Sequence, residues 1–297
     1  MNVGCRILAP IDAVQGAAVP VRILYPTTAA TRVEKFGLYE ADIAIDAPVV
    51  GERRLLVAIS HGTGSTPWAM RGLAAHLARA GFVVVLVEHP GNSRDDDSLA
   101  HTVVNLANRP RHVRLAIDAA LGDPAIAPHV LHDRAAVIGH SLGGYTALAV
   151  AGGKPMALPN QTPDGVAHPI DVVPDPRVRA VVLLAPAVPW FMAPHALDDV
   201  SASVFVRVGE RDELAPPYAV AQILKGVRMD YAVVPGAGHF AWFFPVPPHL
   251  ATLPPGKDPP GFDRAAYQPT LYAEIVAFLQ RQIELGDLRQ HHDDHAH

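Results

Sequence analysis

The chain has 297 residues and a formal net charge of −5, from 24 Lys and Arg against 29 Asp and Glu. Hydrophobic residues make up 49% of it and charged residues 18%, a composition that excludes a disordered or coiled-coil chain. The acidic balance argues against nucleic acid as the main partner, because binding to phosphates needs clustered Lys and Arg.

Apolar runs rich in Val, Ile and Leu predict seven strands, and helical stretches separate most of them. A further strand near Gly4–Leu8 would pair with the first as a hairpin. Four runs, LLVAI, FVVVLV, AAVIG and RAVVLLA, are continuously apolar and should form central strands. The pattern predicts an α/β fold with a mostly parallel central sheet and helices on both faces. In chain order the seven strands are Val19–Tyr25, Arg54–Ser60, Val83–Val87, Ala135–Ile138, Ala180–Leu184, Ser203–Val208 and Tyr231–Val234.

Five segments have the spacing and end signals of helices. Thr66 is suited to cap the first, because its hydroxyl can accept a bond from a backbone N–H, and Pro67 fits the first turn. The last has one apolar face, made of Leu271, Ile275, Phe278 and Leu279. The five helices are expected over Trp68–Ala80, Arg111–Leu121, Leu142–Ala151, Tyr218–Lys225 and Thr270–Ile283.

The segment Gly139-His140-Ser141-Leu142-Gly143 reads G-x-S-x-G between a predicted strand and a predicted helix. That context distinguishes a nucleophile turn from a chance occurrence of the motif. A serine in so sharp a turn leaves no room for side chains two residues before and after it, which explains both glycines. We therefore predict that Ser141 is a nucleophile at the carboxyl edge of the sheet, beside a helix N-terminus that favours negative charge.

A serine nucleophile needs a base, and sixteen histidines compete for that role. His61 and His89 also follow predicted strands, but they precede Ser141, whereas the partners of this motif follow it as an acid and then a histidine. His140 adjoins the serine and should point away from it. His239, after the last strand, is the predicted base.

The acid that orients the base should follow a strand between the serine and His239. Asp212 fits, because it comes after an apolar strand and a glycine turn. His239 would take the hydroxyl proton and return it to the leaving group, while Asp212 holds the imidazole tautomer. Other carboxylates compete with it, the immediate rivals Glu210 and Glu213 and the weaker candidates Asp198 and Asp199, which precede the strand.

Acyl transfer also needs N–H donors aimed at the oxygen that becomes negative. The backbone N–H of Leu142 is one donor, by its place after the serine. The second should come from the turn after the strand Arg54–Ser60, where glycines flank Thr63 and let its N–H face the site. We predict Thr63 and Leu142 as the oxyanion hole, with a plain glycine turn as the alternative.

Two long segments rich in Pro, Gly and polar residues interrupt the alternation, Gly152–Pro176 and Phe244–Phe262. Connections of that length are usually functional lids or disordered. They follow the nucleophile helix and His239, so we expect both to cap the site and limit substrate size. We predict a single domain over residues 1–290 and a disordered tail over His291–His297.

Apolar side chains near the predicted site should line the acyl pocket, although such residues are more often core. The candidates are Trp190, Phe191, Phe240 and Trp242. His129 and His132 have an H-x-x-H spacing, but no carboxylate or further histidine completes a tetrahedral set. The single cysteine, Cys5, excludes an intramolecular disulfide framework and a cysteine-based zinc site. We expect no metal and no cofactor.

Segments spread over nearly the whole chain match the motifs of a known family. They are SHGTGS, EHPGNSRDD, GHSLGGYTALA, DPRVRAVVLLAP, GERDELAPP, GAGHFAW and PPGFDRAAY. With them the chain resembles the alpha/beta-hydrolases, in particular the predicted dienelactone hydrolases, a group similar to the platelet-activating-factor acetylhydrolases. The resemblance implies an alpha/beta-hydrolase fold, a triad of Ser141, Asp212 and His239, and an oxyanion hole of Thr63 and Leu142. Authentic dienelactone hydrolase has a cysteine nucleophile, so the group's name says little about the substrate.

Together the residues predict a cofactor-free serine hydrolase that cleaves carboxylic esters with a short or medium acyl group, through an acyl-enzyme. A lactone, thioester or amide hydrolase is the alternative. A non-catalytic relative that binds a ligand is a third, which the intact triad weakens. The expected partner is a small-molecule ester, and the oligomeric state is left open. No apolar run predicts a membrane span, and MNVGCRILAPID carries no export signal, so we expect a cytoplasmic protein, or an exported one if a signal was removed.

Overall fold

The computed structural model describes residues 1–293, with the side chains of residues 1–284. Within these residues one sheet holds ten strands. From one edge to the other they are β12 (Met229–Val234), β11 (Ser203–Gly209), β10 (Val178–Leu184), β9 (Val130–His140), β7 (Arg54–Ser60), β8 (Val83–Val87), β4 (Val21–Thr27), β1 (Asn2–Leu8), β6 (Tyr39–Ile45) and β5 (Arg32–Phe36). A separate hairpin joins β2 (Ile11–Asp12) to β3 (Ala17–Ala18).

The six strands from β12 to β8 all pair with one another in parallel, so the predicted mostly parallel sheet is confirmed. β4 runs antiparallel to β8 and to β1, and the second pairing is the predicted hairpin near the N-terminus. The four continuously apolar runs form β7, β8, β9 and β10, all inside the sheet. Every residue of β8 is buried, because strands covered on both faces can carry apolar residues at each position.

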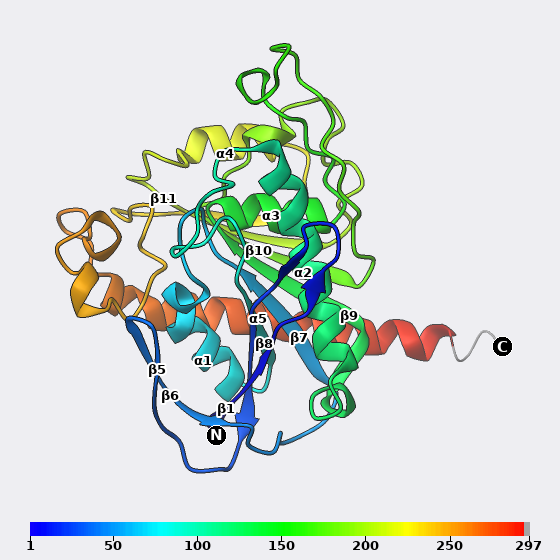
Figure 1. The fold of residues 1–297 in the computed structure, drawn as a ribbon, viewed down its shortest axis with the longest axis vertical. Coiled ribbons are helices and arrows are strands. Elements are labelled where there is room, and N and C mark those ends of the chain that lie inside the picture. The colour runs from blue at the N-terminus through cyan, green and yellow to red at the C-terminus, as the bar shows by residue number, and fades with distance from the viewer. Residues whose placement is uncertain (294–297) are drawn as a thin grey trace.

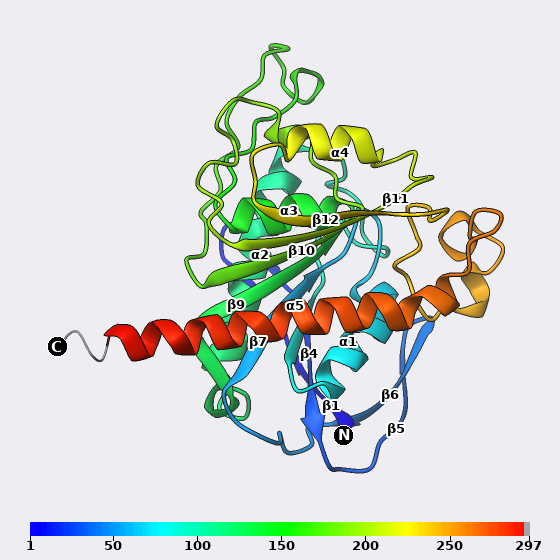
Figure 2. The same ribbon diagram turned by 180° about the vertical axis from the view of Figure 1, so that it is seen from behind.

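Helices cover both faces of the sheet. In residues 1–293 the α-helices are α1 (Arg71–Arg79), α2 (Val103–Gly122), α3 (Leu142–Val150), α4 (Pro217–Ile223) and α5 (Arg264–Asp293). α2 and α3 pack together on one face, and α1 and α5 lie on the other (Figures 1 and 2). Short 3₁₀ helices are η1 (Pro67–Met70), η2 (Ala127–His129), η3 (Pro159–Gln161), η4 (Pro189–Phe191), η5 (Pro248–Leu250) and η6 (Pro254–Gly256).

The predicted apolar face of the last helix is confirmed. Leu271, Ile275 and Leu279 are fully buried, and the Phe278 ring lies 5.4 Å from that of Phe205 in β11. The predicted cap of the first helix is also present, because the Thr66 hydroxyl accepts a hydrogen bond from the backbone N–H at the start of η1. Burial of these apolar side chains holds α5 across the sheet.

Two helices extend beyond their predicted ends, each through a proline. α2 begins eight residues before the predicted Arg111, where the Thr102 hydroxyl accepts a bond from the N–H of Asn105 (3.1 Å). α5 begins at Arg264, before Pro269, and runs to Asp293. The edge hairpin of β5 and β6 was not predicted, because its short polar segments lack an apolar run.

The last helix runs into the predicted tail. Of the tail predicted over 291–297, the first three residues end α5 and the last four lie outside the described residues. The segments 152–176 and 244–262 are largely irregular, as predicted. None of the helices in the described part of the chain has an apolar stretch that would cross a bilayer.

Candidate active site

Ser141 lies in a sharp turn between β9 and α3. Its φ is 53° and its ψ −119°, a left-handed backbone conformation that costs a non-glycine residue about 1–3 kcal/mol. A Cβ on Gly139 would collide with the carbonyl oxygen of Gly143, and one on Gly143 with that of Ser60. Close backbone packing therefore requires both glycines, and the strained turn presents the serine at the end of the strand.

His239 and Asp212 are joined directly. They lie in the loops after β12 and β11, and His239 Nδ1 is 2.9 Å and 3.0 Å from the two carboxylate oxygens of Asp212. The Asp212 side chain is fully buried, and its Oδ1 also accepts bonds from the N–H groups of Leu214 (2.9 Å) and Ala215 (2.7 Å). A carboxylate accepts only, so Nδ1 carries the proton and Nε2 is left to act as a base.

Three of the four rival carboxylates have other partners, and the fourth, Glu213, is exposed. Glu210 accepts a bond from the backbone N–H of Gly236 (2.8 Å) and is exposed. Asp198 bonds His195 (2.7 Å), and Asp199 pairs with Lys154. Of the carboxylates weighed from the sequence, Asp212 is therefore the one that meets His239.

Ser141 and His239 share one cavity of about 420 Å³. The Ser141 hydroxyl makes no hydrogen bond to another atom of the described residues, His239 included. In enzymes without substrate this contact is often long and tightens when substrate binds. Gly62, Thr63 and His140 also line the cavity, together with Tyr39, Gly64, Ser65, Thr66, Ala69, Arg94, Leu214, Phe240, Phe243, Leu250, Leu253 and Pro255.

Both backbone N–H groups predicted as oxyanion donors, those of Thr63 and Leu142, are without a hydrogen-bond partner in the described residues. Thr63 is in the loop after β7 and lines the cavity, while Leu142 begins α3 directly after the serine. The Thr63 hydroxyl accepts a bond from Asn92 Nδ2 (2.7 Å), which ties the loop after β7 to Asn92.

The histidines excluded as bases from the sequence are occupied elsewhere. His61 Nδ1–H donates to the carbonyl oxygen of Gly62 (2.7 Å), and its Nε2 accepts from the N–H of His89 (3.3 Å). His140 Nε2–H donates to the carbonyl oxygen of His239 (3.0 Å) and so fixes the backbone of the loop that carries His239. Burial lowers the pKa of His61 to about 3 and that of His140 well below its ordinary value, so both rings are neutral.

The aromatic residues proposed for the acyl pocket need correction. Phe240 lines the cavity, but Trp242 is buried against Tyr267, with ring centroids 6.3 Å apart. A turn in which the N–H of Phe243 bonds the carbonyl oxygen of Phe240 (3.1 Å) puts these two rings on the same side, so Phe243 replaces Trp242 as a lining residue.

Two other candidates lie outside this cavity lining. The rings of Trp190 and Phe191 pack on Tyr145, at 5.1 Å and 5.6 Å, and Trp190 Nε1 donates to Gln161. Tyr39 does line the cavity and was missed, because its strand β6 was not predicted.

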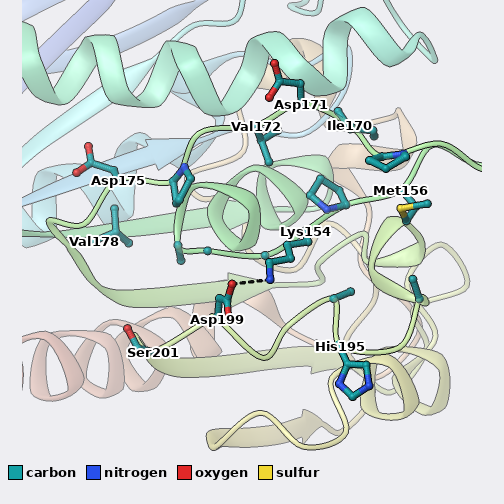
Figure 3. A pocket seen from close by; sticks show the side chains of 18 of the residues that line it. Lys154, Met156, Ile170, Asp171, Val172, Asp175, Val178, His195, Asp199 and Ser201 are labelled. Carbon is teal, nitrogen blue, oxygen red and sulfur yellow. Dashed lines mark ion pairs between the residues drawn. The ribbon is translucent and has the colours of Figure 1, made fainter.

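Only one of the two predicted caps reaches the cavity. The segment 244–262 contributes Leu250, Leu253 and Pro255 to its lining. The segment 152–176 instead borders a separate, larger cavity of about 720 Å³, shown in Figure 3, where the Lys154 ammonium pairs with the Asp199 carboxylate (2.6 Å). The expectation that both segments cap the site is therefore wrong for 152–176.

The H-x-x-H pair has no metal-like arrangement. His129 Nδ1 bonds the carbonyl oxygen of Gly51 (2.6 Å), and His132 Nε2 bonds that of Ala127 (2.9 Å). Among the residues that the structure describes, no three His, Cys, Asp or Glu side chains are grouped so that they could hold a metal ion.

Comparison with known proteins gives similarity in structure only. No family model matches the sequence, and no curated protein does. A ferulic acid esterase from Streptomyces cinnamoneus is 18% identical with a TM-score of 0.66, over 94% of this chain and 89% of its own. A dienelactone hydrolase from Anabaena variabilis is 19% identical with a TM-score of 0.50, over 81% of this chain and 89% of its own.

The chain has the alpha/beta-hydrolase fold. The fold predicted from the sequence is thereby confirmed. At this level of identity the likeness concerns the fold alone, so the function has to be argued from the site.

Proposed function

We propose that the protein is a serine hydrolase that cleaves carboxylic esters with a short or medium acyl group. Ser141 is the nucleophile, His239 the general base and Asp212 the acid that orients it. The observation that carries the proposal is a serine in a strained strand-to-helix turn that shares a cavity with a histidine bonded through Nδ1 to a buried carboxylate.

The proposed reaction has two halves. His239 Nε2 takes the hydroxyl proton as Ser141 Oγ attacks the ester carbon, and the N–H groups of Thr63 and Leu142 receive the oxygen that becomes negative. The imidazolium, stabilised by Asp212, then protonates the leaving alcohol and an acyl-enzyme remains. Water, deprotonated by His239, attacks that ester, and the carboxylic acid leaves as the proton returns to Ser141.

The cavity supports a small substrate. Its volume of about 420 Å³ lies in the range of small-molecule sites, and most of its lining beyond the reacting groups is aromatic or aliphatic. Lactones, thioesters and amides could be cleaved by the same groups, so they belong in the substrate panel.

The test is covalent labelling combined with hydrolysis. We expect a fluorophosphonate to label the protein and Ser141→Ala to abolish labelling. On p-nitrophenyl esters from acetate to palmitate, with a lactone and an anilide added, Ser141→Ala and His239→Ala should each lower kcat by about 10⁵–10⁶-fold. Ser201→Ala, in the other cavity, is the matched control and should react like the wild type. Persistent labelling of Ser141→Ala, or a loss below about tenfold in His239→Ala, would contradict the proposal.

A further inference from the structure

Arg109 is a buried cation with neutral partners. Its side chain is fully buried in α2, and no carboxylate pairs with it among the described residues. Burial lowers its pKa to about 9, so the guanidinium is still charged at neutral pH. It donates to four oxygens, which belong to Thr146 (Oγ1, 3.1 Å), Asn92 (Oδ1, 2.6 Å), Ser60 (Oγ, 3.3 Å) and His61 (backbone O). Burying a charge is costly, and the four bonds offset that cost together with the Asp97 carboxylate, which accepts a bond from Asn92 Nδ2 (2.6 Å) and raises the pKa of Arg109.

One set of these bonds fixes the loop that carries the Thr63 N–H. Arg109 donates to the carbonyl oxygen of His61 and to Asn92 Oδ1. The Nδ2 group of Asn92 in turn donates to the Thr63 hydroxyl (2.7 Å). The Nδ1–H group of His61 donates to the carbonyl oxygen of Gly62 (2.7 Å). Because a trans peptide directs its C=O and N–H to opposite sides, fixing the Gly62 oxygen also fixes the direction of the Thr63 N–H.

The remaining bond reaches the helix that carries the second donor. Arg109 Nε donates to Thr146 Oγ1, and the Thr146 hydroxyl donates to the carbonyl oxygen of Leu142 (3.1 Å). Thr146 is one turn along α3 from Leu142, whose N–H is free. A single guanidinium therefore connects the loop after β7 with the first turn of α3.

We infer that Arg109 is a positioning residue of the oxyanion hole, which holds the N–H groups of Thr63 and Leu142 at the separation that a tetrahedral oxyanion requires. The inference rests on the proposed function, since the separation matters only if the site forms an oxyanion. The planar fork of arginine bonds several oxygens in fixed directions, which a lysine ammonium does not do.

The first test is kinetic. Arg109→Met removes the donors with little change in volume. We expect kcat for p-nitrophenyl acetate to fall about 10- to 100-fold with KM within about threefold, because oxyanion donors act in the transition state and small displacements are costly there. The inhibition constant of a trifluoromethyl ketone, which forms an oxyanion on Ser141, should rise by the same factor. Arg134→Met, another buried arginine at the far end of β9, is the matched control and should keep its kcat.

The second test does not depend on turnover. In crystal structures, Arg109→Met should displace the Gly62–Thr63 peptide relative to Leu142 by more than about 0.5 Å, the tolerance of a working site, whereas Arg134→Met should not. If Arg109→Met fails to fold, Arg109→Lys replaces it, with a smaller loss expected in both tests. An unmoved peptide, or a kcat that stays within about threefold of wild type, overturns the inference. A wild-type protein without hydrolase activity overturns the proposed function instead.

Discussion

At the scale of single residues, the loop after β11 determines which carboxylate contacts His239. The turn closes with a bond from the Asp212 N–H to the carbonyl oxygen of Gly209 (3.1 Å), and two further N–H groups bind Oδ1. Glu210, Asp212 and Glu213 all follow this strand closely, and the local sequence gives only a weak preference for one of them as the partner of His239. The direction of the turn, set by these backbone bonds, selects Asp212 over Glu210 and Glu213.

The variant Asp212→Asn tests whether Asp212, and not Glu210 or Glu213, orients His239. The amide oxygen would keep the backbone donors, so its NH₂ would face His239 Nδ1 and force the ring proton onto Nε2, where the serine proton must go. We expect kcat for p-nitrophenyl acetate to fall about 10⁴-fold. Glu210→Gln, the matched control, should stay within about threefold of wild type, because its partner is the N–H of Gly236. If kcat falls equally in both variants, Asp212 is not the residue that orients His239.

At the scale of elements, the segment 244–262 is anchored over the cavity by contacts from distant parts of the chain. The His249 ring lies 5.7 Å from that of Tyr39 in β6, edge to face, and its Nε2 is 3.2 Å from Arg94 Nη1. The segment 152–176 has a similar composition but borders another cavity. Composition predicts that a segment is irregular, whereas only its long-range contacts determine what it covers.

Leu253→Ala tests the role of the segment 244–262 as a cap. Removing a side chain from the cavity wall frees volume for a longer acyl group. We expect kcat/KM for p-nitrophenyl octanoate relative to acetate to rise about tenfold or more, since one methylene in an apolar pocket changes specificity by at least about tenfold. Val173→Ala, in the segment 152–176, should leave this ratio unchanged. If the ratio changes equally in both variants, or in neither, the segment 244–262 does not determine the acyl preference.

Helix ends show why local rules stop short of the fold. The predicted helix begins at Arg111, directly after Pro110, and a proline removes one N–H donor from a helix. The carbonyl oxygen that this N–H would bond is that of Leu106, and it accepts the Tyr145 hydroxyl of α3 instead (3.0 Å). This contact between two helices lets α2 continue, and no pattern within either helix indicates it. The central strands were predictable because a strand buried on both faces is a run of consecutive apolar residues, which the sequence shows directly.

At the scale of the whole molecule, the parallel sheet brings the site together. The loops after β7, β9, β11 and β12 all leave the same edge of the sheet, so Thr63, Ser141, Asp212 and His239 could be predicted as neighbours from the strand pattern alone. The buried polar network behind them could not. His89 bonds Ser60 (2.8 Å) and His112 (3.2 Å), and these contacts join residues up to 29 positions apart in the sequence.

This network makes stability depend on pH. His61, His89, His112 and His140 are almost fully buried, and burial lowers the pKa of His61 and His112 to about 3 and that of the other two well below the ordinary value. Above about pH 7 the rings are neutral in both the folded and the unfolded chain, so they do not make the free energy of unfolding depend on pH. Below about pH 6.5 the unfolded chain binds protons that the folded one does not, so the free energy of unfolding falls as the pH falls, by about 1.4 kcal/mol per pH unit for each ring.

Urea unfolding between pH 8 and pH 4.5 measures this effect. We expect the midpoint to be constant down to about pH 7 and then to fall steeply. His112→Gln should reduce the slope of the unfolding free energy against pH by about one proton, since it removes one ring that must stay neutral. His195→Gln is the matched control, because its ring is 83% exposed, and it should leave the slope unchanged. A midpoint that does not move between pH 7 and pH 5 would show that these rings take up protons in the folded protein, contrary to their burial.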